Sequence, residues 1–202
     1  MILSFSRNFA FVAVPRTATH ALRARLRPLL AANDWEQSTR YEPRFFPVKA
    51  LAEAGHGHLT PAEVGPFLLP GAWDRMFSFG FVRDPLDRFV STYYFLNRDT
   101  DPERDALGRM KAMIADPSRL LLHPQSRFLI DEDGTPMVSF VGRYERLAED
   151  FATIAARIGA DPEAPGQVNA SPRPARAPVD AELAEMVAQT YAADYRHFGY
   201  AP

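Results

Sequence analysis

Two stretches of this chain share one pattern, in which an apolar run leads into a basic turn and then into apolar residues at helical spacing. The first is FVAVPRTATHALRARL at residues 11–26, and the second is MFSFGFVRDPLDRFVSTYYFL at residues 76–96. A continuous apolar run is typical of a strand buried on both faces, and alternating strands and helices favour a parallel sheet. The pattern therefore predicts an α/β fold with both basic turns at the carboxyl edge of a central parallel sheet.

The rest of the chain continues this alternation, and we expect one domain over residues 1–202. The sequence TPAE at residues 60–63 predicts a helix start, because it offers a hydroxyl cap, a proline in the first turn and a glutamate at the third position. The proline-rich residues 160–178 predict a long loop. We expect strands at residues 9–14, 76–82 and 137–145, and helices at 17–30, from 85 onward, 102–115, 147–158 and 180–195.

Composition excludes several classes of function. The 23 basic and 25 acidic residues give a formal charge of −2, so neither a nucleic-acid partner nor a membrane surface is expected. The chain has no cysteine, which removes disulfides and thiolate metal sites and is consistent with a reducing, cytoplasmic location. The opening residues lack the basic region of a signal peptide, and no apolar stretch approaches the roughly 20 residues that span a bilayer. The sequence leaves the oligomeric state open.

The carboxyl edge of a parallel sheet is where helix amino termini offer free N–H groups to anions. Each basic turn adds a cation at that edge, Arg16 in the first and Arg83 in the second. A ligand with two separated anionic groups would satisfy both turns. The first turn lacks the glycines and the lysine of a Walker A loop, so a P-loop-like kinase is a weaker alternative.

The chain resembles the PAPS-dependent sulfotransferases, where PAPS is 3′-phosphoadenosine 5′-phosphosulfate. It is most similar to the bacterial and carbohydrate branch related to the heparan sulfate uronosyl sulfotransferases. FVAVPRTATHAL resembles the family loop that holds the 5′-phosphosulfate, and FVRDPLDRFVSTYY resembles the element that holds the 3′-phosphate. HPQSRFL at 123–129, VGRYERLAEDF at 141–151 and YRHFGY at 195–200 are similar to the family in the same order.

This resemblance implies a three-layer, P-loop-like sulfotransferase fold and transfer of a sulfuryl group from PAPS to a hydroxyl-bearing acceptor, expected to be a glycan. It implies no metal. The late loop of the family folds over the nucleotide, which suggests contacts from Asn169 and Ser171. The resemblance implies that PAPS is held by Arg16, Thr17, Ala18, Thr19, His20, Arg83, Ser91, Asn169 and Ser171.

The chain departs from the family at Arg16, where a lysine is usual, and at Thr19 and His20. Arginine stays protonated, so Arg16 can stabilise charge on the bridging oxygen but cannot donate a proton. These departures keep a second alternative open, a PAPS-binding module with weak or no turnover. The family's His-Gly-His occurs here at residues 56–58, so His56 is the first candidate for the catalytic base and His58 the second.

The segment between the two phosphate motifs is where contacts to the acceptor are expected. It offers aromatic and basic side chains suited to stacking or to an anionic sugar: Trp35, Tyr41, Arg44 and Lys49.

Overall fold

The computed structural model describes residues 1–38, 46–166, 174 and 177–202. These residues form a five-stranded sheet in the order β3-β1-β2-β4-β5. The pairs β2–β4 and β4–β5 are parallel, whereas β1 runs antiparallel to both of its neighbours. The strands are β1 (Ile2–Ser4), β2 (Phe9–Val12), β3 (Trp35–Glu36), β4 (Phe77–Val82) and β5 (Phe140–Arg143).

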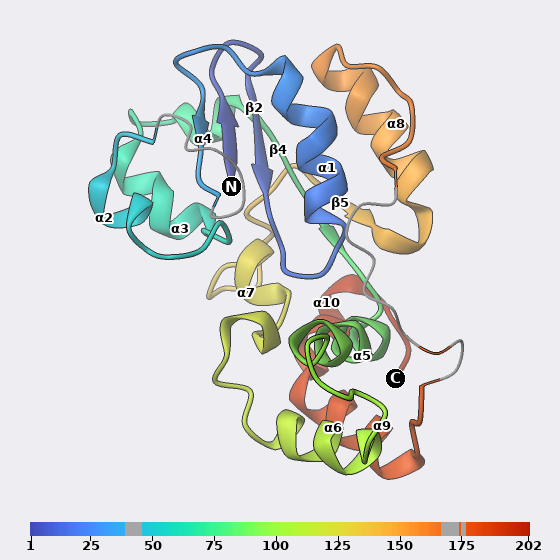
Figure 1. Ribbon diagram of the computed structural model, residues 1–202. Helices are drawn as coiled ribbons and strands as arrows, with labels where there is room; N and C mark the ends of the chain where they lie inside the picture. Colours follow the sequence, from blue (N-terminus) through green and yellow to red (C-terminus); the bar gives the residue numbers. More distant parts are fainter. Residues whose placement is uncertain (39–45, 167–173, 175–176) are drawn as a thin grey trace.

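Each face of the sheet carries its own apolar core. On one face, phenylalanines from β2 and β4 pack against α1 (Thr19–Leu26) and α8 (Leu147–Ile158). On the other face, Leu59, α3 (Pro61–Val64) and α7 (Ser126–Leu129) cover the alternate strand residues. Figure 1 shows α1 and α8 next to the strands. Because β2 and β4 are covered on both sides, their side chains are buried throughout except at Phe77.

Four helices form a third core beyond the carboxyl ends of β2 and β4. They are α5 (Pro85–Leu96), α6 (Ala106–Ala115), α9 (Ala181–Thr190) and α10 (Ala192–Phe198). Figure 1 shows this group below the sheet, so the helix that follows β4 leads away from the sheet. The short helices α2 (Lys49–Ala52) and α4 (Ala72–Arg75) lie between β3 and β4 in the chain. One 3₁₀ turn, Arg27–Leu29, extends α1, and the others are Gly65–Phe67, Leu120–Leu122 and Tyr144–Arg146.

The predicted strand–turn–helix units are present. The Thr60 side chain and Glu63 form a complete capping box at α3, and Asp84 caps α5 by accepting the N–H of Asp87. The long predicted helix at residues 17–30 ends as an α-helix at Leu26 and continues as the 3₁₀ turn. The helix predicted at 102–115 starts only at Ala106, because Asp105 has a left-handed backbone (φ 50°).

Three details differ from the sequence-based expectation. The central sheet is not wholly parallel, because a turn of only four residues, with Asn8 at φ 56°, connects β1 to β2 and forces a hairpin. The third predicted strand is half-buried, since it is the edge strand β5. The last predicted helix is two helices with a break at Tyr191, whose hydroxyl donates to the Leu122 carbonyl 2.8 Å away. Among the described residues, no helix combines the length and apolarity needed to cross a bilayer.

Candidate functional site

The first basic turn connects β2 to α1 without any glycine. Arg16 (φ 66°) and Ala18 (φ 62°) both adopt left-handed backbone angles, which cost an ordinary residue about 1–2 kcal/mol each. The Thr17 hydroxyl, fully buried, donates to the Val14 carbonyl at 3.0 Å and closes the turn. Left-handed residues spaced in this way turn backbone N–H groups toward one side, as in anion-binding nests. The Thr17 hydroxyl hydrogen is therefore used within the turn and is not offered to an anion.

The second basic turn connects β4 to α5, and the Arg83 side chain is held between Asp87 of α5 and Tyr144, which follows β5. The Arg83 Nε donates to the Asp87 carboxylate at 2.6 Å, and its guanidinium lies 4.0 Å from the centre of the Tyr144 ring. Arg83 is only 5% exposed, so this geometry is largely fixed by packing. Sequence reasoning did not identify Asp87 or Tyr144 as neighbours of Arg83, although both lie in segments that resemble the family.

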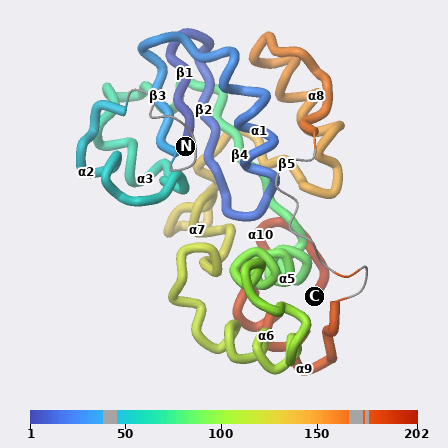
Figure 2. The backbone as a smooth tube through the Cα atoms, in the orientation of Figure 1, coloured from blue at the N-terminus to red at the C-terminus, as the bar shows by residue number. Residues whose placement is uncertain are grey.

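The two turns meet at the carboxyl edge of the sheet. The Arg83 Nη1 donates to the Arg16 carbonyl at 3.4 Å. In the other direction, Arg16 Nε and Nη2 donate to the Ser91 hydroxyl oxygen at 3.3 and 2.9 Å, and the Arg16 guanidinium lies over the Phe95 ring. Figure 2 shows the β2–α1 connection beside the start of α5. The structure thus brings Arg16, Arg83 and Ser91 together from segments 67 to 75 residues apart.

The backbone and the side chain of Arg16 belong to different parts of the site. Its backbone belongs to the first turn, but its guanidinium lies on Ser91, which the resemblance assigns to the 3′-phosphate. The remaining residues of the first turn follow at the amino terminus of α1, where Thr19 is buried and His20 is half-buried. A helix amino terminus presents N–H donors and a partial positive charge. This edge therefore combines backbone donors with two guanidinium groups.

The histidine pair lies just before α3 and next to the end of β2. The His58 Nδ1 is 2.6 Å from the Ala13 carbonyl, and the His58 N–H donates to His56 Nδ1 at 3.3 Å. Because a carbonyl only accepts, Nδ1 of His58 carries the hydrogen and Nε2 keeps its lone pair. Burial lowers the pKa of His58 to about 3, against the opposing effect of the bond to Ala13. His58 is thus a neutral imidazole in a fixed tautomer.

Gly57 lets this histidine loop approach the body of the protein closely. A Cβ at Gly57 would lie 2.8 Å from the Gln37 carbonyl and 3.0 Å from Nη2 of Arg23. That Nη2 donates to the carbonyls of Gln37 and Gly57 at 3.0 and 3.1 Å, while Nη1 pairs with Glu36 at 2.7 Å. Arg23 is buried, and its contacts with Glu36 and with the two carbonyls fix the position of the histidine loop.

The buried neutral state of His58 predicts acid sensitivity of the fold. The unfolded chain protonates this histidine below about pH 6.5, while the folded protein does so only near pH 3, so stability falls as pH falls through this window. The slope approaches about 1.4 kcal/mol per pH unit. Relative to His58→Gln, the wild type should lose about 2 kcal/mol more between pH 7 and pH 5. Urea unfolding at the two pH values measures this, and equal losses in both proteins would contradict it.

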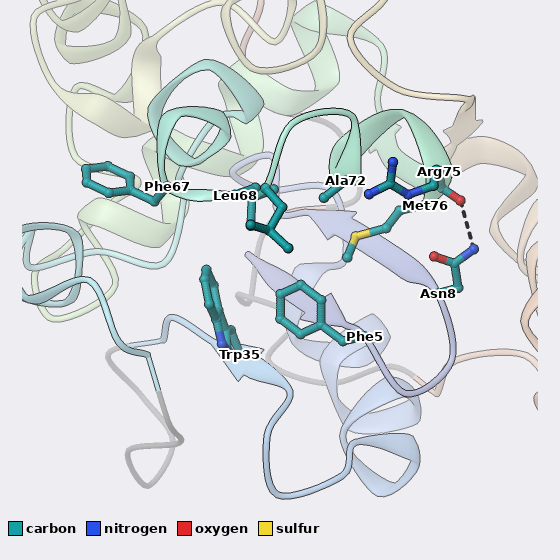
Figure 3. Close-up of a pocket in the computed structure, with 9 residues that line it drawn as sticks. Phe5, Asn8, Trp35, Phe67, Leu68, Ala72, Arg75 and Met76 are labelled. Atoms are coloured by element: carbon teal, nitrogen blue, oxygen red, sulfur yellow. Dashed lines mark hydrogen bonds between the residues drawn. The ribbon is translucent and has the colours of Figure 1, made fainter.

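Two cavities lie away from these turns. One, of about 380 Å³, is mostly apolar and lies at the β1–β2 hairpin and α4, beyond the amino ends of β2 and β4. Figure 3 shows Phe5, Trp35 and Leu68 converging on it. The other, of about 560 Å³, is lined by residues of α3, α4 and the segment before β5. Trp35, expected among the acceptor contacts, thus lines the cavity at the amino ends of β2 and β4 and not the two basic turns.

Some predicted residues are not part of this geometry. Asn169 and Ser171, proposed to contact the nucleotide, lie outside the described residues, as do Tyr41 and Arg44. Lys49 is exposed and lies 3.9 Å from Glu53. Among the described residues, no group of three or more His, Asp or Glu side chains is arranged to hold a metal ion.

Much of this chain is similar in sequence to a known protein family. The sequence model of the Sulfotransferase family matches residues 60–201, more than two thirds of the chain. The chain belongs to the sulfotransferase family. The matched region contains the second basic turn and α10, whereas the first turn and the histidine pair precede it. In this sulfotransferase, the contacts of Arg83 with Arg16 therefore connect the matched region to the preceding segment. Comparison with curated proteins and with solved structures gives no match.

Proposed function

We propose that this protein transfers a sulfuryl group from PAPS to a hydroxyl of a carbohydrate-like acceptor and releases 3′,5′-ADP. Membership of the family indicates sulfuryl transfer in general. The observation that carries the more specific proposal is the contact between the two basic turns, because it creates one site for a doubly anionic ligand. We further propose that residues 1–202 form one domain of the three-layer, P-loop-like type.

The proposed site divides the nucleotide between the two turns. Arg83 and Ser91 bind the 3′-phosphate, with the Arg16 guanidinium as a second cation beside Ser91. The described contacts of the Arg83 guanidinium use Nε and Nη1, so Nη2 is left to donate to a phosphate oxygen. The backbone of the first turn, from Arg16 to His20, binds the 5′-phosphosulfate at the amino terminus of α1.

The reaction needs one base and stabilisation of the leaving group. As the acceptor oxygen attacks sulfur, its proton passes to a histidine, and the bond from sulfur to the bridging oxygen breaks. The electron pair of that bond goes to the 5′-phosphate of 3′,5′-ADP, where backbone N–H groups of the first turn stabilise the charge. We propose His58 over His56 as the base because of its orientation, since its bond to Ala13 leaves Nε2 unprotonated and fixed in direction, although its lowered pKa of about 3 makes it a weak base.

A thermal titration tests the donor. At a concentration 100 times its Kd, 3′,5′-ADP should stabilise the protein by about 2.7 kcal/mol and raise Tm by about 5–10 °C. ATP, which lacks a 3′-phosphate, should give a much smaller rise. Stabilisation by ATP without a response to 3′,5′-ADP would instead favour the kinase-like alternative. Turnover of labelled PAPS with a panel of glycans, phenols and lipids then identifies the acceptor class and separates an enzyme from a binding module.

A further inference from the structure

Gln125 pairs with the backbone of the arginine that the proposed site depends on. The Arg83 N–H donates to Gln125 Oε1 at 2.9 Å, and Gln125 Nε2 donates to the Arg83 carbonyl at 2.8 Å. Strand pairing ends one residue earlier, where Val82 is opposite Arg143. The Gln125 amide thus continues the backbone pairing of β4 by one residue, in place of a neighbouring strand. Gln125 is fully buried, so water cannot take over these two bonds.

Gln125 is itself fixed by the last helix of the chain. The Asp194 carboxylate, fully buried in α10, accepts the backbone N–H groups of Gln125 and Ser126, both at 2.8 Å. Arg88 lies 4.0 Å from the same carboxylate and donates to the His123 carbonyl at 3.0 Å. The buried segment therefore has polar anchors from α5 and from α10. A chain of contacts runs from Asp194 through Gln125 to the backbone of Arg83.

We propose that Gln125 is a positioning residue for the 3′-phosphate, acting through the backbone N–H and carbonyl of Arg83. This inference rests on the proposed function. Asp87 and Tyr144 contact the outer part of the Arg83 side chain, but among the described contacts only Gln125 pairs the N–H and the carbonyl on either side of the Arg83 Cα, from which the side chain starts. Without Gln125, a buried N–H and a buried carbonyl lose their partners, which favours rotation of the two peptides that flank the Arg83 Cα and displacement of the guanidinium.

The test compares 3′,5′-ADP with AMP, which carries the same adenosine and 5′-phosphate but no 3′-phosphate. Isothermal titration of the full chain gives both Kd values for wild type, Gln125→Leu and Gln125→Glu. A positioning role predicts that both variants lose about tenfold or more of their affinity for 3′,5′-ADP, with little change for AMP. Leu122→Ala is the matched control, because it removes a buried side chain from the same segment without touching Arg83. It should lower Tm and keep the preference for 3′,5′-ADP.

Gln125→Glu adds a second measurement, the pH dependence of the preference for 3′,5′-ADP, which should not change if Gln125 has a purely structural role. Its carboxylate can still accept the Arg83 N–H but cannot donate to the Arg83 carbonyl, whereas its protonated form can do both. Burial raises the pKa of such a carboxyl. The preference of this variant for 3′,5′-ADP over AMP should therefore recover, relative to wild type at the same pH, as pH is lowered from 8 toward 5.5. This variant also keeps the test available if Gln125→Leu does not fold.

The outcomes separate the two proposals. If wild type does not prefer 3′,5′-ADP to AMP, the proposed function fails, and the role of Gln125 fails with it. If wild type shows the preference and both Gln125 variants keep it, only the positioning role is overturned. Loss of the preference in Leu122→Ala to the same extent would also overturn it, because general loosening of the segment would then explain the effect.

Discussion

Replacing His58 with alanine should reduce kcat for sulfuryl transfer by about 10²-fold, the lower end of the usual contribution of a general base, because its lowered pKa makes it a weak one. The bond between Nδ1 and the Ala13 carbonyl sets the tautomer, and it leaves the lone pair of Nε2 to accept the proton of the acceptor hydroxyl. The Kd for 3′,5′-ADP should stay within a few-fold of the wild-type value, because His58 is not among the proposed phosphate ligands. Single-turnover assays with labelled PAPS separate these two quantities.

His56→Ala is the matched control for this prediction. His56 accepts the His58 N–H through Nδ1, so its loss removes one support of the loop but not the proposed base. We expect a smaller fall in kcat, about tenfold or less. If His56→Ala abolished turnover while His58→Ala retained it, His56, the first candidate from the sequence, would be the base. Retention of full activity in both variants would exclude the whole histidine pair.

The sequence was sufficient to locate both basic turns because their signals are local. Apolar runs, the TPAE capping box and the Asp-Pro start of α5 each depend on a few consecutive residues. The meeting of Arg16 with Arg83 could be expected as well, since the carboxyl ends of adjacent parallel strands share one edge. Elements of two or three residues, such as β1 and β3, are too short to show a periodic pattern.

Contacts between distant segments could not be predicted from the sequence. The bond between Asp194 and the Gln125 N–H joins residues 69 positions apart, and neither residue type signals it. HPQSRFL resembled the family, but the resemblance assigned no role to its glutamine. The direction of the Arg16 side chain is likewise set by packing, because Phe95 and Ser91 both lie on one face of α5. The position of a turn can thus be predicted from the sequence, but the sequence does not say which of its side-chain atoms face a ligand.

Replacing Arg83 with methionine should weaken binding of 3′,5′-ADP by about 100-fold, because hydrogen bonds to charged groups contribute about 1.5–3 kcal/mol each. Methionine keeps much of the length and apolar stem of arginine but has no donor or charge. It also leaves the Asp87 carboxylate facing the proposed phosphate, and this repulsion adds to the loss. Arg83→Lys keeps the charge without the planar fork, so an intermediate loss of about tenfold is expected.

Arg98→Met is a matched control, since the Arg98 guanidinium lies 4.6 Å from the centre of the same Phe95 ring as Arg16 but its side chain is exposed. It removes the same charge from the neighbourhood of the site and should change the Kd by less than about threefold in 0.15 M salt. Binding of AMP should change much less than binding of 3′,5′-ADP in all three variants, with the largest change in Arg83→Met, which also removes the bond to the Arg16 carbonyl. If Arg83→Met lost affinity for AMP and 3′,5′-ADP equally, Arg83 would act on a part of the nucleotide that both ligands share. The assignment of the second turn to the 3′-phosphate would then be wrong.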